Sequence, residues 1–327
     1  MQQARRVVTV FVFTAILALL VDCARPTPLL RVGTNIWPGY APLYLAQQLD
    51  YYRQQNIRIV EFGSATEVLR AFRNGVIEVA ALTLDETLLL AQNHLDPRVI
   101  LVMDVSLGAD VVLGQAEFRR LEDLRGKRVG VENTAVGAYL LARALQTAGM
   151  RAENVTLVPL PEDEHERAFV ERRVDAIVTF EPTRTRLLAR QANLLFDSSN
   201  IPGEIMDVLV VRAANSERYA PALAHLLHGW FAALDVIAQR PAQAAVPLGT
   251  FLSLTPTQAL QSFAGLQLLT ADENRSYLTA PATQFASVTQ RLVQVMRDAR
   301  VLTDSIDVAR LPDDAALIAS QHLAVPP

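Results

Sequence analysis

The sequence predicts an α/β fold with two similar lobes, each built on a mostly parallel sheet. A two-strand hinge joins the lobes, and a helical C-terminal tail follows. Three observations lead to this prediction. Strand patterns alternate with helix patterns of about 10–15 residues, which is typical of βαβ units. A block of sequence recurs 97 positions further along the chain. The length of 327 residues is sufficient for about two domains, each with its own core.

The composition is that of a folded chain. Hydrophobic residues make up 51% and charged residues 20%, whereas disordered chains are poor in apolar residues and rich in charge. The formal net charge of -4 argues against a nucleic-acid partner, because such proteins normally carry a basic excess or stripe. Lys127 is the only lysine, so lysine-dependent chemistry has a single candidate.

The first lobe is predicted over residues 29–110. Its strand patterns lie at residues 29–34, 57–62 and 76–82. The helix that follows the first strand and its loop is expected to begin near Pro42, because a proline is tolerated in the first helical turn. Capping-box patterns at residues 64–67 and 83–86 predict that a helix begins directly after each of the other two strands.

The recurring block makes the two lobes similar. The run Arg-Val-Gly at residues 31–33 reappears at 128–130, and Arg-Ala-Phe at 70–72 reappears at 167–169. The strand at 78–81 has its counterpart 97 positions later. Chance matching of short motifs is the alternative. The nearly constant offset over several anchors favours two lobes that each begin with a βαβ unit.

The second lobe is predicted over residues 111–206, and residues 207–327 form a return strand and a helical tail. Crossings between the lobes are expected near residues 105–112 and 207–212. We expect the tail to pack on the first lobe, because no linker composition separates it from the return strand.

The first 23 residues have the features of an export signal. Arg5 and Arg6 precede an apolar run at residues 7–21, which is shorter than the roughly 20 residues of a membrane-spanning helix. The run then reaches Cys23 in a pattern similar to a bacterial lipobox, with Asp22 in place of the usual small residue. We expect lipidation at Cys23 and a location in the periplasm or at the outer face of the inner membrane. A buried N-terminal helix with an inert thiol is the alternative.

The candidate site lies on loops that follow the strands. In open α/β sheets ligands bind outside the carboxyl ends of the strands, where helix N-termini offer N–H groups and partial positive charge. The 97-residue offset pairs loops of the two lobes, so the ligand is expected in the cleft between them. The candidate binding residues are Asn35, Trp37, Tyr40, Ser64, Thr66, Asp85, Glu132, Asn133, Thr134 and Glu181.

The chemistry of these side chains favours a nitrogen cation. Trp37 and Tyr40 offer aromatic faces, and Asp85 and Glu181 offer carboxylates beside them. The loops lack the arginine clamp expected of a charge-based anion site. A zwitterion stays open, because helix N-termini accept anionic groups. The alternative interpretation is that the two carboxylates only cap their helices and that Trp37 closes the edge of its lobe.

Enzyme motifs are missing from the sequence. It contains no nucleophile elbow, phosphate-binding loop, His-Glu-x-x-His or dinucleotide fingerprint, and we expect no catalytic residue, cofactor or metal site. His225 and His228 are interpreted as surface or core residues of a helix. His94 and His165 lie in polar surroundings and are expected to be solvated.

Three segments carry a resemblance to a known family. NIWPGYAPLYLA at residues 35–46, DLRGKRVGV at 123–131 and VDAIVTFEP at 174–182 are similar to segments of the nitrate/sulfonate/taurine-type solute-binding proteins of ABC importers. The thiamine-pyrimidine-related binding proteins belong to the same group.

The resemblance implies a type II periplasmic binding protein fold that closes on a ligand by hinge motion. The expected function is capture of a small polar organic molecule (an amine, an aminosulfonate or a pyrimidine-like compound) for an ABC permease, by a monomer. A receptor that regulates a membrane sensor protein is the alternative. A pyrimidine-synthesis enzyme of the same fold is the third interpretation.

Overall fold

The computed structural model describes residues 28–132, 135–298 and 301–324. The predicted export signal with Cys23, and the candidate residues Asn133 and Thr134, lie outside the described residues.

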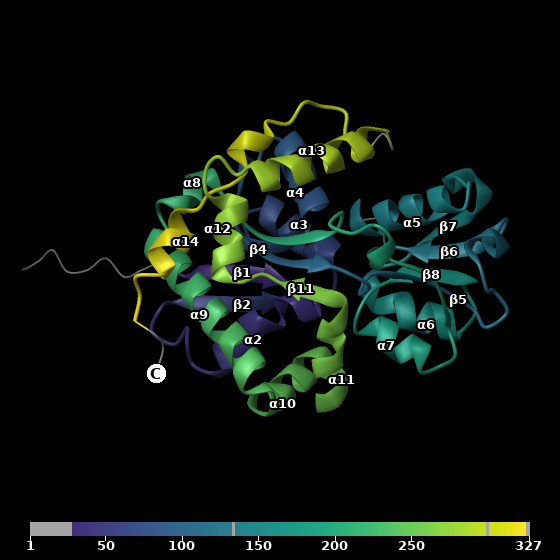
Figure 1. The fold of residues 1–327 in the computed structure, drawn as a ribbon, viewed down its shortest axis with the longest axis horizontal. Coiled ribbons are helices and arrows are strands. Elements are labelled where there is room, and N and C mark those ends of the chain that lie inside the picture. Colours follow the sequence, from purple (N-terminus) through teal and green to yellow (C-terminus); the bar gives the residue numbers. More distant parts are fainter. Residues whose placement is uncertain (1–27, 133–134, 299–300, 325–327) are drawn as a thin grey trace, which may run out of the picture.

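Lobe one is built on a six-stranded mixed sheet in the order β11-β4-β10-β3-β1-β2 (Figure 1). Its strands are β1 (Leu30–Thr34), β2 (Ile57–Glu61), β3 (Val79–Thr83), β4 (Pro97–Ser106), β10 (Met206–Arg212) and β11 (Leu266–Leu268). Strand β1 pairs in parallel with β2 and β3. Strand β10 runs antiparallel to its neighbours β3 and β4. Three helices follow the parallel strands: α2 (Ala41–Gln48), α3 (Ala65–Arg73) and α4 (Leu84–Gln92).

Lobe two repeats this plan on a five-stranded sheet in the order β7-β6-β8-β5-β9. Its strands are β5 (Val111–Gly114), β6 (Arg128–Val131), β7 (Thr156–Pro159), β8 (Ala176–Thr179) and β9 (Asn193–Asp197), and its α-helices are α5 (Ala135–Thr147), α6 (His165–Val170) and α7 (Thr183–Leu188). Strand β6 pairs in parallel with β7 and β8, whereas β5 is antiparallel to β8 and β9. The predicted two-lobed α/β fold is therefore confirmed.

The two lobes contain equivalent hydrogen bonds and ion pairs at positions 97 residues apart. In lobe one the backbone N–H of Arg31 donates to the Glu78 carboxylate at 2.9 Å, and the two side chains form an ion pair. In lobe two the backbone N–H of Arg128 donates to Asp175 at 2.8 Å, and their side chains also pair. Each pair joins the start of a parallel strand to the turn before the neighbouring strand. Equivalent positions therefore fix the same strand register in both lobes.

The lobes are joined by two crossings. The first, residues 107–110, links β4 to β5, and the second, residues 198–205, links β9 to β10. The predicted position of the second crossing, 207–212, is wrong, because that apolar run is β10 and pairs on both sides within the sheet of lobe one. Ser198 ties the crossings together: its hydroxyl lies 2.7 Å from Ser106 Oγ and accepts from the Gly108 N–H at 2.7 Å. Gly108 has a φ of +120°, which favours glycine there.

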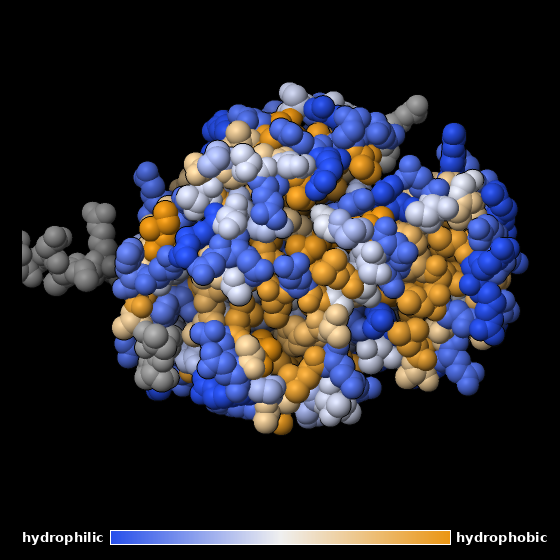
Figure 2. Space-filling model, viewed as in Figure 1, coloured by the Kyte–Doolittle hydropathy of each residue, from blue (hydrophilic) through white to orange (hydrophobic). Residues whose placement is uncertain are grey.

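The C-terminal helices cover lobe one. They are α8 (Ala213–Ser216), α9 (Ala220–Gln239), α10 (Pro241–Leu252), α11 (Pro256–Gln261), α12 (Ala271–Leu278), α13 (Thr283–Asp298) and α14 (Ala315–Ser320). Helix α9 packs against α2, α10 and α14, while α12 contacts β4 and α13 contacts α4. In the space-filling view hydrophilic side chains dominate the outer end of lobe two, and apolar ones gather towards the middle of this face (Figure 2).

Helix α9 is the one described helix that is long and apolar enough to span a membrane by composition, and half of its apolar window is buried inside the molecule. Trp230 in this helix is fully buried. The contacts of α9 with three other helices account for its apolar character as a packed core helix.

Candidate ligand-binding site

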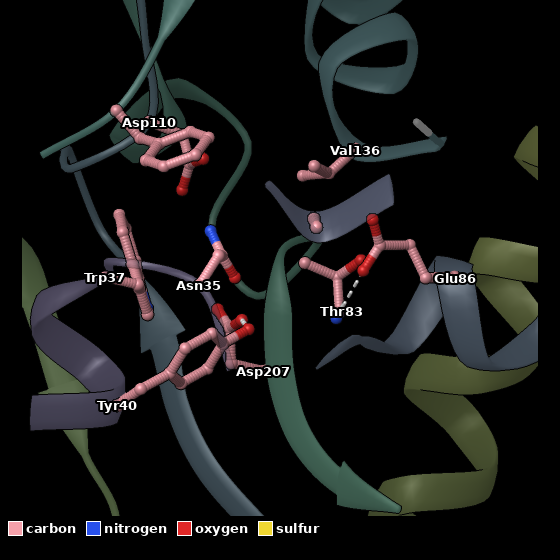
Figure 3. A pocket seen from close by; sticks show the side chains of 10 residues that line it. Asn35, Trp37, Tyr40, Thr83, Glu86, Asp110, Val136 and Asp207 are labelled. Atoms are coloured by element: carbon pink, nitrogen blue, oxygen red, sulfur yellow. Dashed lines mark hydrogen bonds between the residues drawn. The ribbon is translucent and has the colours of Figure 1, made fainter. Parts of the chain in front are cut away.

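A cavity lies where the two lobes and the first crossing meet (Figure 3). About 30 Å³ of its interior is open to a molecule the size of water, so the cavity is nearly closed in this structure. Its walls come from the loops after β1 and β3, from the first crossing, from the start of β10 and from lobe two. The lining residues are Asn35, Trp37, Tyr40, Ala65, Thr83, Glu86, Asp110, Val136, Phe180 and Asp207.

Aromatic side chains form one wall of the cavity. Trp37 of lobe one meets Phe180 of lobe two edge-to-face, with ring centroids 5.5 Å apart and an interplanar angle of 87°. Trp37 Nε1 donates to Asp104 Oδ2 at 3.2 Å, and the Tyr40 hydroxyl donates to Asp207. The Trp37 N–H and the Tyr40 hydroxyl therefore both donate to carboxylates, and the two side chains line the cavity.

Acidic side chains also line the cavity. Figure 3 shows Glu86 across the cavity from Trp37 and Tyr40, with Asp207 between them. Glu86 is 1% exposed, and Asp110 is 5% exposed. Glu86 Oε1 and Asp110 Oδ2 have no hydrogen-bond partner among the described residues. Buried polar atoms normally find partners, so these two oxygens mark positions for the polar atoms of a ligand.

Burial raises the pKa values of the acidic side chains in and around the cavity. The pKa of Asp110 is raised to about 7 and that of Glu86 to about 8, in each case chiefly because burial disfavours the charged form and secondarily because a neighbouring acid repels it. Burial likewise raises the pKa of Asp85 to about 6 and that of Asp104 to about 8. The pKa of Asp207 lies well above its usual value for the same reason.

The cavity has no matching positive charge. Among the described residues that line it, none is Arg, Lys or His. A group of buried acids without a basic partner is unfavourable in an empty protein. Such perturbed carboxyls in a concave site are typical of a functional site. The arrangement is suited to a ligand that brings positive charge and hydrogen-bond donors.

Three of the sequence-predicted residues line the cavity: Asn35, Trp37 and Tyr40. Asn35 Nδ2 also donates across the cleft to Glu162 Oε2 at 2.8 Å. Glu132 lines a smaller adjoining hollow beside Asp110.

Two predicted residues of the α3 loop have other contacts. Ser64 caps α3, where its hydroxyl accepts from the Glu67 N–H at 3.3 Å. The hydroxyl and N–H of Thr66 donate to Glu132 Oε1 of lobe two at 2.7 and 3.3 Å. With the Asn35–Glu162 bond, these contacts close the cleft from lobe to lobe.

The two carboxylates predicted to hold the cation do not line the cavity. Glu181 accepts from Arg184 Nη1 at 2.9 Å and from the N–H and hydroxyl of Thr185 at 3.1 and 3.0 Å, so it caps the start of α7. Asp85 is 4% exposed and lies behind the lining residues, where its charge raises the pKa values of Glu86 and Asp110. Capping by Glu181 was the alternative interpretation of the sequence.

Seven lining residues were missed by the sequence analysis: the acidic or aromatic Glu86, Asp110, Phe180 and Asp207, and also Ala65, Thr83 and Val136. Glu86 and Phe180 are sequence neighbours of the chosen residues Asp85 and Glu181. Asp110 lies in the first crossing and Asp207 in β10, each next to apolar residues, and an isolated acid in an apolar run is a signal for a buried carboxylate.

His165 differs from its predicted solvated state. It is 1% exposed, and its ring lies 3.2 Å from Thr179 Oγ1 and 3.3 Å from the Leu160 carbonyl. Burial lowers its pKa to about 4, so it is neutral at physiological pH. Within the described ranges, no group of three or more His, Cys, Asp or Glu side chains is placed to hold a metal ion.

The fold and site define a two-lobed ligand-binding protein, in which a cavity is enclosed between hinged lobes. A model of the NMT1-like family matches residues 24–247, more than half of the chain, and the chain belongs to this family. Its fold is that of the periplasmic solute-binding proteins.

Solved structures share this fold at low sequence identity. The alkanesulfonate-binding protein SsuA of Xanthomonas axonopodis pv. citri, bound to MOPS, is 20% identical, with a TM-score of 0.73 over 88% of this chain and 98% of that chain. The periplasmic aliphatic sulphonate-binding protein SsuA of Escherichia coli is 18% identical, with a TM-score of 0.70 over 87% and 91% of the two chains.

Curated relatives match a shorter segment. A Brucella abortus protein described as a binding protein is 28% identical over 124 residues, which is 35% of this chain. The chain therefore spans only 38% of the length of the curated relatives it matches.

Proposed function

We propose that the protein is the solute receptor of an ABC importer and that it captures a small organic molecule through a positively charged nitrogen. The observation that carries this proposal is the cavity between the lobes, where Glu86 and Asp110 each direct an unpartnered buried oxygen inward. A nitrogen cation supplies both the charge and the hydrogen bonds that these carboxylates need, and the faces of Trp37 and Tyr40 add cation–π attraction.

The acidic lining argues against an anionic ligand such as a sulfonate. The SsuA proteins are described as binding sulfonates, but their identity to this chain supports a shared fold only. An isolated sulfonate in this cavity would face three lining carboxyls with no lining Arg, Lys or His to balance it. An aminosulfonate or an aminopyrimidine is compatible with the proposal, because its amino group can bind to the lining carboxyls.

Isothermal titration tests the proposed function. Purified mature protein is titrated with simple amines, taurine, an aminopyrimidine, nitrate and sulfate. We expect heat from amine-bearing compounds and none from nitrate or sulfate. Asp110→Asn should weaken amine binding, whereas Glu153→Gln, an exposed carboxylate on lobe two, should leave it unchanged. Tight nitrate or sulfate binding that is insensitive to Asp110→Asn would overturn the proposal.

We propose further that lipidation at Cys23 holds the receptor at the outer face of the inner membrane, close to its permease. The support is the apolar run ending at Cys23. Expression of the full chain and of a Cys23→Ser variant, followed by membrane fractionation, tests this. The native chain should sediment with membranes and the variant should be released. Equal partition of both chains would contradict the anchor.

A further inference from the structure

The unpartnered oxygens of the cavity indicate which hydrogen-bonding groups a ligand should offer, in addition to its charge. Glu86 and Asp110 come from different elements, the first turn of α4 and the first crossing. Glu86 is 1% exposed and Asp110 is 5% exposed, so water has little access to either. Their free oxygens, Glu86 Oε1 and Asp110 Oδ2, therefore need hydrogen-bond donors from within the cavity.

Three side-chain donors on the lining are already engaged, and a fourth, the Thr83 hydroxyl, has no partner among the described residues. Trp37 Nε1 donates to Asp104, Tyr40 donates its hydroxyl to Asp207, and Asn35 Nδ2 donates to Glu162. None of these three groups turns its donor towards the free oxygens. The Thr83 hydroxyl has a single hydrogen and can serve only one of the two oxygens, so at least one donor must come from the bound molecule.

Two kinds of organic cation could occupy a site of this charge. A quaternary ammonium ion has no N–H and is usually recognised by an open box of aromatic faces. Here Trp37 and Phe180 contact each other edge-to-face at 5.5 Å, so no methylated nitrogen fits between those two rings. A quaternary ion would also leave at least one of the free oxygens of Glu86 and Asp110 buried and unpaired, which is unfavourable.

We propose that the ligand's cationic nitrogen carries N–H bonds, as in a primary ammonium, amidinium or guanidinium group, and that the site rejects quaternary ammonium ions of the same charge. This inference rests on the proposed function and narrows it to one class of cation. A site built to hydrogen-bond a substrate N–H discriminates strongly against the analogue that lacks it, because its own buried groups are then left without partners.

Matched pairs of probes test the inference. Each pair shares a carbon skeleton and differs only in N-methylation: ethanolamine and choline, benzylamine and benzyltrimethylammonium, and 1,4-diaminobutane and its bis-trimethylammonium analogue. Binding is measured by titration and by the quenching of tryptophan fluorescence, since Trp37 lines the cavity. The primary member of at least one pair should bind, at least about 10-fold more tightly than its methylated partner.

The variants are judged by the ratio of the two affinities and not by affinity alone. Asp110→Asn and Glu86→Gln should each reduce the ratio, because an amide replaces a free carboxylate oxygen. Glu153→Gln, on the exposed surface of lobe two, should keep it. The ratio in the unmodified protein does not depend on whether a variant folds.

The outcomes distinguish the N–H inference from the proposed function on which it rests. Equal or tighter binding of the quaternary members overturns the N–H inference and leaves the proposed cation receptor standing. Binding of nitrate or sulfate, with no binding of either cation series, overturns the proposed function itself. A quaternary nitrogen in a compound that mass spectrometry finds bound to the protein from cells would also overturn the inference.

Discussion

The side chains that matter most for the proposed function are three buried carboxyl groups. Glu86, Asp110 and Asp207 line a cavity in which none of the described lining residues is basic, and burial raises the pKa of each. Such groups lower the stability of the empty protein, and functional sites commonly contain residues of this kind. Stability and binding should therefore respond in opposite directions when one acid is neutralised.

Glu86→Gln tests this opposition. The variant removes a buried acid that has no basic partner in the lining, so the empty protein should unfold at a higher temperature than the native chain. Its affinity for a primary amine should fall by about 10-fold or more, since a charged hydrogen bond contributes about 1.5–3 kcal/mol. Thermal unfolding and titration on the same sample measure both. A variant that is less stable and binds equally well would refute the assignment of Glu86.

The pH dependence follows from the raised pKa values of Asp110, about 7, and Glu86, about 8. In the unfolded chain both groups lose their protons near pH 4. Between about pH 4 and pH 8 the folded protein therefore holds more protons than the unfolded chain, and its stability falls as pH rises. Affinity for an amine should rise over the upper part of this range, because the carboxyls ionise while the amine stays charged.

Melting curves of the empty protein and titrations with ethanolamine at several pH values check both signs. Asp110→Asn should flatten both profiles around pH 7. An affinity that falls as pH rises from 6 to 8 would indicate that protonated carboxyls act as donors to an anion, contrary to the proposal.

At the scale of elements, each lobe contains the same strand-to-turn ion pair. The Glu78 side chain is 9% exposed beside Arg31, whereas Asp175 is 24% exposed beside Arg128. Both carboxylates accept a backbone N–H as well as a guanidinium. The pair with the less exposed carboxylate, Arg31–Glu78, should contribute more to stability, because water replaces a lost partner poorly at a buried position.

Glu78→Ala and Asp175→Ala form a matched pair. We expect Glu78→Ala to lower the free energy of unfolding by about 1–3 kcal/mol and Asp175→Ala to lower it by less than about 1 kcal/mol. Chemical denaturation of the two variants gives the comparison. A larger loss for Asp175→Ala would show that burial does not set the strength of the repeated pair.

The turn before α2 depends on a glycine. A Cβ on Gly39 would overlap the Asp104 carboxylate and Trp37 Nε1, so Gly39→Ala must push the two groups apart. We expect a loss of about 1–3 kcal/mol in stability together with weaker binding. At Gly63 a Cβ would meet only the mobile end of Glu67, at 3.3 Å, and Gly63→Ala serves as the control. Equal effects of the two changes in melting temperature would contradict this account.

At the scale of the whole molecule, hydrogen bonds and ring contacts hold the cleft closed. Thr66 bonds to Glu132 at 2.7 Å, Asn35 to Glu162 at 2.8 Å, and Trp37 meets Phe180. The two crossings are tied through Ser198, which places the pivot beside Asp110. Ligand and lobe closure therefore act on the same residues, as expected of a hinged receptor.

Thr66→Val keeps the shape of the side chain and removes its hydroxyl donor to Glu132. The closed state should lose about 1 kcal/mol, and apparent ligand affinity should fall by a factor of about 5. Small-angle scattering should show a larger radius of gyration for the variant at subsaturating ligand. Unchanged affinity and an unchanged radius would mean that this contact does not contribute to closure.

Local sequence was enough to predict the alternation of strands and helices, the repeated lobe, the caps at Ser64 and at the start of α4, and the aromatic loop with Trp37 and Tyr40. These features depend on neighbours a few residues away, or on a fixed offset that is visible in the sequence. The polar and acidic character of the cleft loops was visible in the same way.

Tertiary structure alone decided which carboxyl groups line the cavity. Asp85 and Glu86 are adjacent, but successive residues of a helix point about 100° apart, so only the packing of α4 decides that Glu86 enters the cavity. Asp110 and Asp207 are distant in sequence and meet because both crossings pass the same point. Glu181 was turned away by its contacts with Arg184 and Thr185. Orientation and burial are set by non-local packing, which a local sequence pattern does not encode.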